Sequence, residues 1–361
     1  MSTQPPLRVA THKPYYAAID GVRAICVLLV MLNHLKTTGH IYFLPQPHLG
    51  VDIFFIISGF LITGLLCLEQ KQTGKVDFGA FYWRRAFRII PVYSAVLLLY
   101  VAVCQLPSMS EKWVQLKAGM PWFLTFMNEF AVEPNHGNVF THTWSLGIEE
   151  KFYLFWPLLF FLVAKTTRMR AVLVAIFFAA VCFEPFSGRF YHAGAYYGLL
   201  MGSLTAFALS SSYRSRIESA IRRIPAVVMA GVFVGAFYLE DYTRSVLLGF
   251  SVLISLFMVH IVVKRSWLSG LLGSAPMVWL GKRSYSMYLV HVLCLNAIEN
   301  RPRIENTLSV VGVIAVSYAL TALVAECLYR TVEEPARRGG KQFLAARMRR
   351  LSARQPALEL S

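Results

Sequence analysis

RAICVLLVMLNH, residues 23–34, is the stretch that decides the fold: Arg23 and His34 enclose an apolar run. Their separation of eleven residues is almost three helical turns, which places both side chains on one stripe, roughly 16 Å apart along the helix axis. Each of the two costs several kcal/mol to remove from water. A membrane helix that carries both is therefore expected to use them, with partners supplied by the rest of the chain.

The composition is that of a polytopic membrane protein. Of the 361 residues, 56% are hydrophobic and only 15% are charged, whereas a soluble domain has nearer 25% charged residues. The first fourteen residues are polar and lack a signal-peptide pattern, which predicts that the first apolar segment is retained as a signal anchor. The six cysteines all fall in apolar segments without ligand spacing, which predicts neither a disulfide framework nor a metal site.

Ten apolar segments have roughly the length needed to cross a bilayer. The stretch 113–131 is ambiguous because it holds Lys117, Pro121, Asn128 and Glu129, and it is interpreted as a half-helix or surface helix. The ten predicted spans lie near residues 17–36, 49–68, 87–106, 144–164, 171–186, 191–210, 225–239, 245–263, 284–298 and 308–330.

The distribution of positive charge supports ten spans. With a cytoplasmic N-terminus, the inner segments hold 26 of the 35 lysines and arginines and the outer segments hold seven, while Arg23 and Lys151 lie within spans. An eleventh span at 113–131 would invert everything after it and remove this bias. The sequence therefore predicts an all-α integral membrane protein, a bundle of about ten transmembrane helices with both termini cytoplasmic.

The net charge of +16 is explained by this topology, so no nucleic-acid partner is expected. Residues 336–361 form a basic cytoplasmic tail after a transmembrane domain spanning residues 1–335. The tail is interpreted as an amphipathic segment on anionic membrane lipids.

The topology sorts the unusual polar residues by depth. His34, Asp52 and Glu149 fall near the outer ends of their spans, and His142 falls in the loop just before the span that carries Glu149. Arg84, Arg85 and Arg88 fall at the inner end, at the predicted start of the third span. This predicts an anion site facing the cytoplasm and a separate acid/base site facing outward.

The three inner arginines have two interpretations. Arg85 and Arg88 share one helix face, and with Arg84 and a positive helix N-terminus they suit a multiply phosphorylated ligand. A stop-transfer cluster that touches lipid phosphates is the simpler interpretation.

His34 has an unperturbed pKa near neutrality and suits a general base, or it is a histidine hydrogen-bonded at the membrane interface. Asp52 opens its span as an N-cap, or it orients His34. His291 lies within the ninth span of the list and either lines a pocket or bonds a neighbouring helix. His48 and Asp52 match an H-x-x-x-D pattern, which is common by chance.

The fourth predicted span carries a polar stripe. Ser145, Glu149 and Tyr153 are spaced four residues apart and should face the bundle interior. Trp144 and Trp156 are belt residues or pocket walls, with the belt favoured for Trp156.

Together these residues resemble the acyltransferase-3 family of bacterial integral membrane acyltransferases, of the glycan O-acetyltransferase type. The resemblance covers nearly the whole chain and several motifs in order. The matching stretches are IDGVRAICVLLVMLNH (19–34), GVDIFFIISGFLIT (50–63), FYWRRAFRIIP (81–91) and HTWSLGIEEKFYLFWP (142–157), with weaker matches at GKRSYSMYLVH (281–291) and VEEP (332–335).

The resemblance implies a multi-pass protein of the bacterial cytoplasmic (inner) membrane. It implies transfer of an acyl group, usually acetyl, from cytoplasmic acyl-CoA to a hydroxyl of an extracytoplasmic or lipid-linked carbohydrate. Acetyl-CoA is then the acyl-donor cosubstrate, and no metal is required. The family's motifs fall on Arg23 with His34, on Arg85 with Arg88, on the carboxylates Asp52 and Glu149, and on Ser58 with Gly59 and Phe60.

The working hypothesis gives His34 the role of base, oriented by Asp52 or Glu149. The inner arginines hold the donor's phosphates. Arg23 binds pantetheine or thioester oxygens, or stabilises developing negative charge. In full, it assigns His34, Asp52 and Glu149 to catalysis, Arg23, Arg84, Arg85 and Arg88 to cofactor binding, and Ser58, Trp144, Ser145 and Tyr153 to substrate binding. A non-enzymatic transporter or glycan-export component is the alternative, because intramembrane Arg, His and Glu also mark solute pathways. A membrane O-acyltransferase of the unrelated lipid-modifying class is a third.

Overall fold

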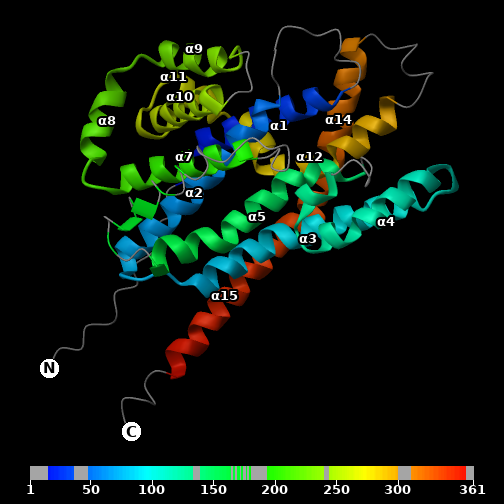
Figure 1. Ribbon diagram of the computed structural model, residues 1–361, viewed down its shortest axis with the longest axis horizontal. Coiled ribbons are helices and arrows are strands. Elements are labelled where there is room, and N and C mark those ends of the chain that lie inside the picture. Colours follow the sequence, from blue (N-terminus) through cyan, green and yellow to red (C-terminus); the bar gives the residue numbers. More distant parts are fainter. Residues whose placement is uncertain are drawn as a thin grey trace.

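The computed structural model describes residues 15–35, 48–132, 139–163, 193–239, 244–299 and 310–354, with a few isolated residues between 166 and 179. Every regular element in these ranges is helical (Figure 1). The prediction of an all-α protein is therefore confirmed for the described part of the chain.

Helices occur at each predicted span that the structure describes, while most of the predicted span 171–186 lies outside the described residues. Five helices are long and apolar enough to cross a membrane, and a sixth span is possible if α8 and α9, which meet at a 93° bend, act together. Ten spans and cytoplasmic termini remain predictions. The helices at the predicted spans are α1 (Ala17–His34), α2 (Leu49–Thr73), α3 (Phe78–Cys104), α5 (Trp144–Pro157), α7 (Ala193–Ser210), α9 (Ala226–Ala236), α10 (Arg244–Val263), α12 (Ala275–Glu299) and α14 (Val310–Leu328).

The remaining elements connect these helices. The ambiguous stretch forms α4 (Ser110–Leu124), which is not among the candidate spans. A π-helix, η5 (Leu158–Val163), extends α5. The other connecting elements are η2 (Pro107–Met109), η3 (Asn128–Val132), η4 (Thr141–Thr143), α8 (Arg214–Arg223) and α11 (Trp267–Leu272).

Helices α1 and α2 lie at the centre of the molecule because both supply residues to two apolar clusters. One cluster joins Met31 and Phe55 to α3, α5 and α12. The other joins Ile19 and Ile53 to α9 and α10. Helices α1 and α2, which carry Arg23, His34, Asp52 and Ser58, therefore sit between the two packed halves, and Figure 1 shows them there.

Helices α2 and α7 approach each other through glycines. A Cβ added to Gly59 would collide with the carbonyl of Leu199 on α7, and one added to Gly202 would collide with the carbonyl of Ile56 on α2. Small residues let membrane helices pack with their backbones in contact. This contact fixes the part of α2 that carries Ser58.

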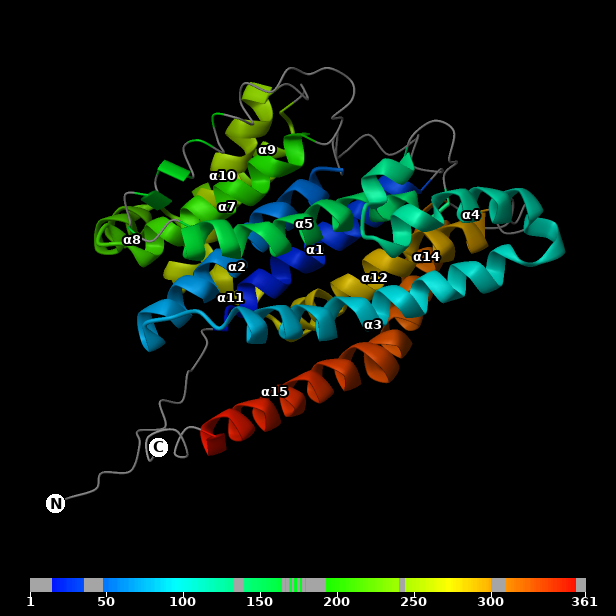
Figure 2. The same cartoon turned by 60° about the horizontal axis from the view of Figure 1, so that its bottom comes forward.

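The predicted basic tail continues a long helix. Helix α14 passes through the π-helix η6 (Tyr329–Glu333) into α15 (Glu334–Arg354), and α15 runs along α3 (Figure 2). The Phe343 ring lies 5.0 Å from Trp83 and 5.8 Å from Phe87, measured between ring centroids. The tail is thus packed on α3 through Phe343 and through Arg347, whose Nη1 atom lies 3.7 Å from Asp77 Oδ1.

Candidate active site

The inner arginines lie within α3 and not at its N-terminus. Helix α3 begins at Phe78, where the Asp77 side chain accepts a hydrogen bond from the amide of Ala80 at 2.8 Å. The predicted span starts at residue 87, since a run of arginines is typical of a membrane boundary, whereas the helix begins nine residues earlier. The predicted contribution of a helix N-terminus to anion binding is therefore wrong.

Arg85 and Arg88 instead line a cavity of about 90 Å³ between α1, α2, α3, α5 and α12. We call this cavity the arginine pocket. Its polar lining residues are Arg23, Ser58, Arg85, Arg88, Ser145, Glu149, Tyr153, Ser284, Tyr285 and Tyr288. Glu149 shares the pocket with the arginines, so the prediction that it belongs to a separate outward-facing site is wrong.

Hydrogen bonds to Glu149 form one wall of the arginine pocket. Ser58 Oγ donates to Glu149 Oε1 at 2.7 Å, and Tyr153 Oη donates to Glu149 Oε2 at 3.0 Å. The guanidinium of Arg85 lies over the Tyr153 ring, 4.8 Å from its centroid. The polar stripe of α5 therefore faces the bundle interior. Glu149 is hydrogen-bonded to two hydroxyls and not to His34.

The pocket concentrates positive charge. Arg23 pairs with Asp20 at 3.3 Å, while Arg85 and Arg88 form no ion pair within the described residues. Guanidiniums that face one cavity of low dielectric repel each other, and an anion or a strongly polarised oxygen relieves that repulsion. The arrangement suits a ligand with a partial or full negative charge.

Arg84 does not join the other two arginines. Its Nη2 atom pairs with Glu69 Oε2 at 3.2 Å, and the Arg84 side chain is 36% exposed. It is absent from the lining of the arginine pocket. The neighbouring position on a helix is turned by about 100°, which directs Arg84 away from the face of Arg85 and Arg88.

Three histidines from separate elements form a second group, which we call the histidine cluster. The rings of His34 and His291 lie 4.8 Å apart, and those of His291 and His142 lie 5.1 Å apart. His34 is exposed, whereas His142 and His291 are buried. His34 is thus the member that an incoming molecule reaches.

Backbone carbonyls fix the tautomer of all three rings. His34 Nδ1 donates to the Val30 carbonyl at 2.8 Å, His142 Nε2 to that of Leu289 at 3.1 Å, and His291 Nδ1 to that of Tyr288 at 2.5 Å. A carbonyl only accepts, so each of these nitrogens carries the proton. Burial, with His34 nearby, lowers the pKa of His142 to about 3, and its ring is neutral.

The second ring nitrogens of the cluster are left with free lone pairs. His142 Nδ1 and His291 Nε2 are buried and have no hydrogen-bond partner in the part of the chain that the structure describes. Buried polar atoms without a partner are rare and call for an explanation. These lone pairs are available to a proton that arrives on His34.

The predicted orientation of His34 by a carboxylate is not found. Within the described residues, His34 has only the Val30 carbonyl and the His291 ring as partners. Asp52 is buried inside the first turn of α2, which begins at Leu49, so it is not an N-cap. The sequence singled out His142 and His291, but no spacing rule joined them to His34.

A pair of hydroxyls connects the two groups. Ser145 Oγ and Tyr288 Oη lie 2.6 Å apart and both residues line the arginine pocket. Tyr288 Oη also donates to the carbonyl of His142. Tyr288 was not predicted as a site residue, although it belongs to the SYSMYLVH stretch that ends at His291.

The tryptophans are structural in this arrangement. The Trp144 ring packs 6.0 Å from that of Phe55 and does not line the arginine pocket. Trp156 is only 2% exposed and donates to Thr63 Oγ1 at 2.8 Å. The interpretation of Trp156 as a belt residue is therefore wrong.

Comparisons with known proteins agree with the resemblance. The profile of the acyltransferase domain family acyltransferase-3 matches residues 16–326. The O-acetyltransferase OatA of Staphylococcus aureus, in strains NCTC 8325 and COL, is 30% identical over 372 residues, which cover 92% of this chain and 58% of OatA. The chain thus spans little more than half the length of these relatives. No solved structure matches the chain significantly.

Proposed function

The chain belongs to the acyltransferase-3 family, and from this premise we propose that it is a multi-pass O-acyltransferase of a bacterial cytoplasmic membrane. It moves an acetyl group from cytoplasmic acetyl-CoA to a hydroxyl of an extracytoplasmic or lipid-linked carbohydrate. The printed name of its OatA relatives, O-acetyltransferase, supports acetyl as the group and oxygen as the acceptor. The apolar helices support the membrane location.

The arginine pocket holds the reacting end of the donor. Arg23, Arg85 and Arg88 face a space of about 90 Å³, which has room for an acetyl thioester but not for a nucleotide, because pockets for ligands of that size are about 300–1,000 Å³. The guanidiniums bind the carbonyl and amide oxygens at this end. They also stabilise the negative charge that develops on the carbonyl oxygen in the transition state.

His34 acts on the acceptor. Its Nε2 lone pair takes the proton of the acceptor hydroxyl as that oxygen attacks the thioester carbon. The carbon–sulfur bond then breaks, and the proton held on His34 neutralises the departing thiolate. Transfer thus conserves charge, and His34 returns to its neutral form.

His142 and His291 assist this proton movement. A protonated His34 presents a new N–H at Nε2, and the adjacent ring of His291 carries an Nε2 without a hydrogen-bond partner among the described residues. Hydrogen bonds to a charged donor are stronger than those to a neutral one. The cluster, rather than Asp52 or Glu149, stabilises the imidazolium.

One observation carries the proposal: the rings of His291 and Tyr288 connect an exposed histidine with a fixed tautomer to a pocket lined by three arginines. The test is transfer of radiolabelled acetyl from acetyl-CoA to the cell-envelope glycan fraction of a deletion strain. Label is expected with the wild type and lost in His34→Ala and Arg85→Ala at normal expression. Full labelling with His34→Ala rejects the mechanism.

The transporter alternative is separated by a binding measurement. An acyltransferase is stabilised by CoA, since a ligand that binds only the folded state raises the unfolding temperature. A transporter of glycans should show no such rise. Binding of the basic tail to anionic lipids is tested separately, with anionic vesicles and no CoA.

A further inference from the structure

A second and larger cavity lies next to the arginine pocket. Its volume is about 540 Å³, and Leu61 lines both cavities. Helix α2 runs past both, because Ser58 faces the arginine pocket and Lys71 faces the second cavity. We call the second space the basic cavity.

The rim of the basic cavity is strongly positive. Its charged lining residues are Lys71, Arg170, Arg214, Glu218 and Arg222. Arg214 Nε donates to Glu218 Oε1 at 2.7 Å, which neutralises one of the four cations. Lys71 and Arg222 form no ion pair within the described residues. Several cations around one opening, with a single carboxylate, favour a ligand that carries more than one phosphate.

Part of the wall of the same cavity is apolar. Phe60, Leu65, Phe207 and Val262 lie on its walls, and Tyr16 contributes a further ring. Small-molecule sites combine apolar walls with placed polar groups that fix the orientation of the ligand. The cavity therefore suits a ligand that combines an aromatic or aliphatic body with phosphates.

We propose that the basic cavity binds the phosphorylated nucleotide end of the acyl-CoA donor, while the pantetheine arm passes Leu61 into the arginine pocket. This inference rests on the proposed function. The arginine pocket is too small for the nucleotide, and the basic cavity, at about 540 Å³, has the volume of a ligand site. The separation of thirteen residues between Ser58 and Lys71 corresponds to roughly 20 Å of helix, comparable with an extended pantetheine arm.

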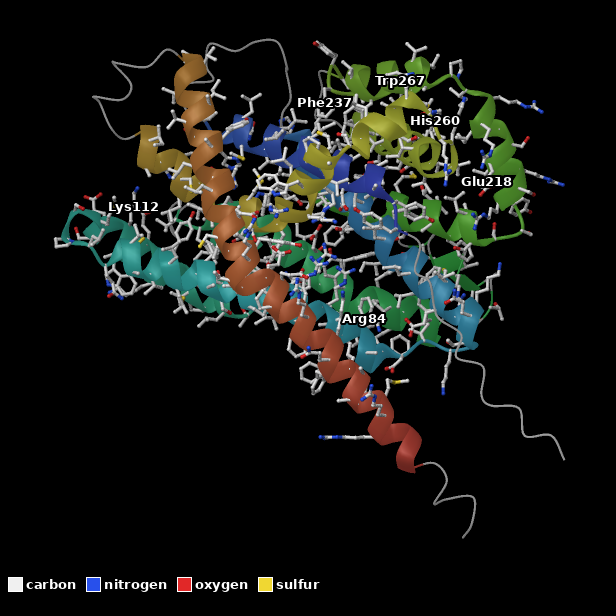
Figure 3. All side chains as sticks on the ribbon, turned by 180° about the vertical axis from the view of Figure 1, so that it is seen from behind. Arg84, Lys112, Glu218, Phe237, His260 and Trp267 are labelled. Carbon is white, nitrogen blue, oxygen red and sulfur yellow. The ribbon has the colours of Figure 1, made fainter. Side chains whose placement is uncertain are left out.

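The location of the rim agrees with a cytoplasmic donor. All four cations fall in the segments that the charge distribution assigns to the cytoplasmic side, 71–88, 165–170 and 214–223. Figure 3 shows Glu218 on α8 at the rim of the molecule, well away from Arg84 on α3. The rim is thus distinct from the arginine motif of α3.

The test measures binding of adenosine 3′,5′-bisphosphate, the nucleotide end alone, to the purified full chain in phosphatidylcholine nanodiscs by calorimetry. Arg222→Gln and Lys71→Gln are each expected to weaken binding about tenfold, the loss of one charged hydrogen bond. Arg223→Gln is the matched control, because Arg223 follows Arg222 on the same helix and does not line the cavity. Equal binding by Arg222→Gln and Arg223→Gln overturns the proposal.

A lipid phosphate is the other source of the same chemistry, and a second arm separates it. In nanodiscs that contain phosphatidylglycerol, the Kd of the wild type for adenosine 3′,5′-bisphosphate should stay within about twofold of its value in phosphatidylcholine. Both measurements use a salt concentration that screens the surface charge. Loss of nucleotide binding in phosphatidylglycerol, restored in phosphatidylcholine, would assign the cavity to lipid and overturn the proposal.

Kinetics separate this inference from the proposed function. The ratio of kcat/KM for acetyl-CoA to that for S-acetylpantetheine, which lacks the nucleotide, should fall about tenfold in Arg222→Gln. An unchanged ratio in an active enzyme rejects the nucleotide site alone. A wild type that binds adenosine 3′,5′-bisphosphate but transfers acetyl from neither donor rejects the proposed function alone.

Discussion

At the scale of single residues, the two buried histidines beside His34 make the sharpest prediction. In His291→Phe, a protonated His34 loses the lone pair of the adjacent ring. We expect kcat to fall about 10- to 100-fold, the worth of one hydrogen bond to a charged group. The KM for acetyl-CoA should stay within about twofold, because His291 does not line the arginine pocket.

A matched control for this variant lies in α10. His260 is fully buried, and neither of its ring nitrogens has a hydrogen-bond partner within the described residues. It belongs to neither the histidine cluster nor the arginine pocket, so His260→Phe should retain wild-type kcat. Equal losses in the two variants would mean that removal of any buried histidine harms folding. Equal retention would remove His291 from the mechanism.

The three arginines of α3 make a second prediction at this scale. Arg85→Gln and Arg88→Gln each remove a guanidinium from the arginine pocket, and the KM for acetyl-CoA should rise about tenfold. Arg84→Gln removes only a half-exposed pair with Glu69, an interaction worth about 0–1 kcal/mol. Steady-state kinetics on the three variants checks this, and a rise in KM for Arg84→Gln equal to the others would contradict the geometry.

At the scale of helices, the contact between α2 and α7 depends on its glycines. Gly59→Ala and Gly202→Ala each place a methyl group against a backbone carbonyl of the other helix. A backbone carbonyl moves aside less readily than a side chain. Overpacking of this kind lowers the free energy of unfolding by about 1–3 kcal/mol. Thermal unfolding in detergent should show a lower midpoint for both variants.

Gly231→Ala is the control for the glycine variants. Gly231 lies in α9, and nothing among the described residues stands within 4 Å of a Cβ added there. Alanine favours a helix over glycine by about 1 kcal/mol, so this variant should be neutral or slightly more stable. Unfolding midpoints that fall alike in all three variants would show that the close approach of α2 to α7 is not the cause.

The boundaries of the helices show which features of the fold the sequence predicts and which it does not. Apolar length located α1, α2 and α10 to within a few residues. It failed at α3, because a run of arginines resembles a membrane boundary, yet aromatic neighbours and α15 allow the helix to continue through it. Apolar length also says nothing about which helices meet, so the convergence of α3 and α5 at Glu149 required the structure.

At the scale of the whole molecule, the sequence likewise identifies the unusual residues but does not predict their arrangement in space. Arg23, His34, Arg85, Arg88 and Glu149 stand out in the sequence because charge is costly in an apolar helix. Their partners do not stand out, since Tyr288 and Leu61 are ordinary residues of membrane helices. The two cavities that meet at Leu61 thus depend on helix packing, which no local pattern encodes.

The orientation of the molecule in the membrane is the last prediction, and both proposals depend on it. The positive charge distribution places the turn at Gly74 and the C-terminus in the cytoplasm. Fusions of green fluorescent protein at either position should therefore fluoresce, and alkaline phosphatase should be inactive there. Alkaline phosphatase fused at Met109, in the predicted outer loop, should be active, with immunoblots to equalise expression. Active phosphatase at Gly74 would place Lys71 and the basic cavity on the outer face, where cytoplasmic acyl-CoA cannot reach them.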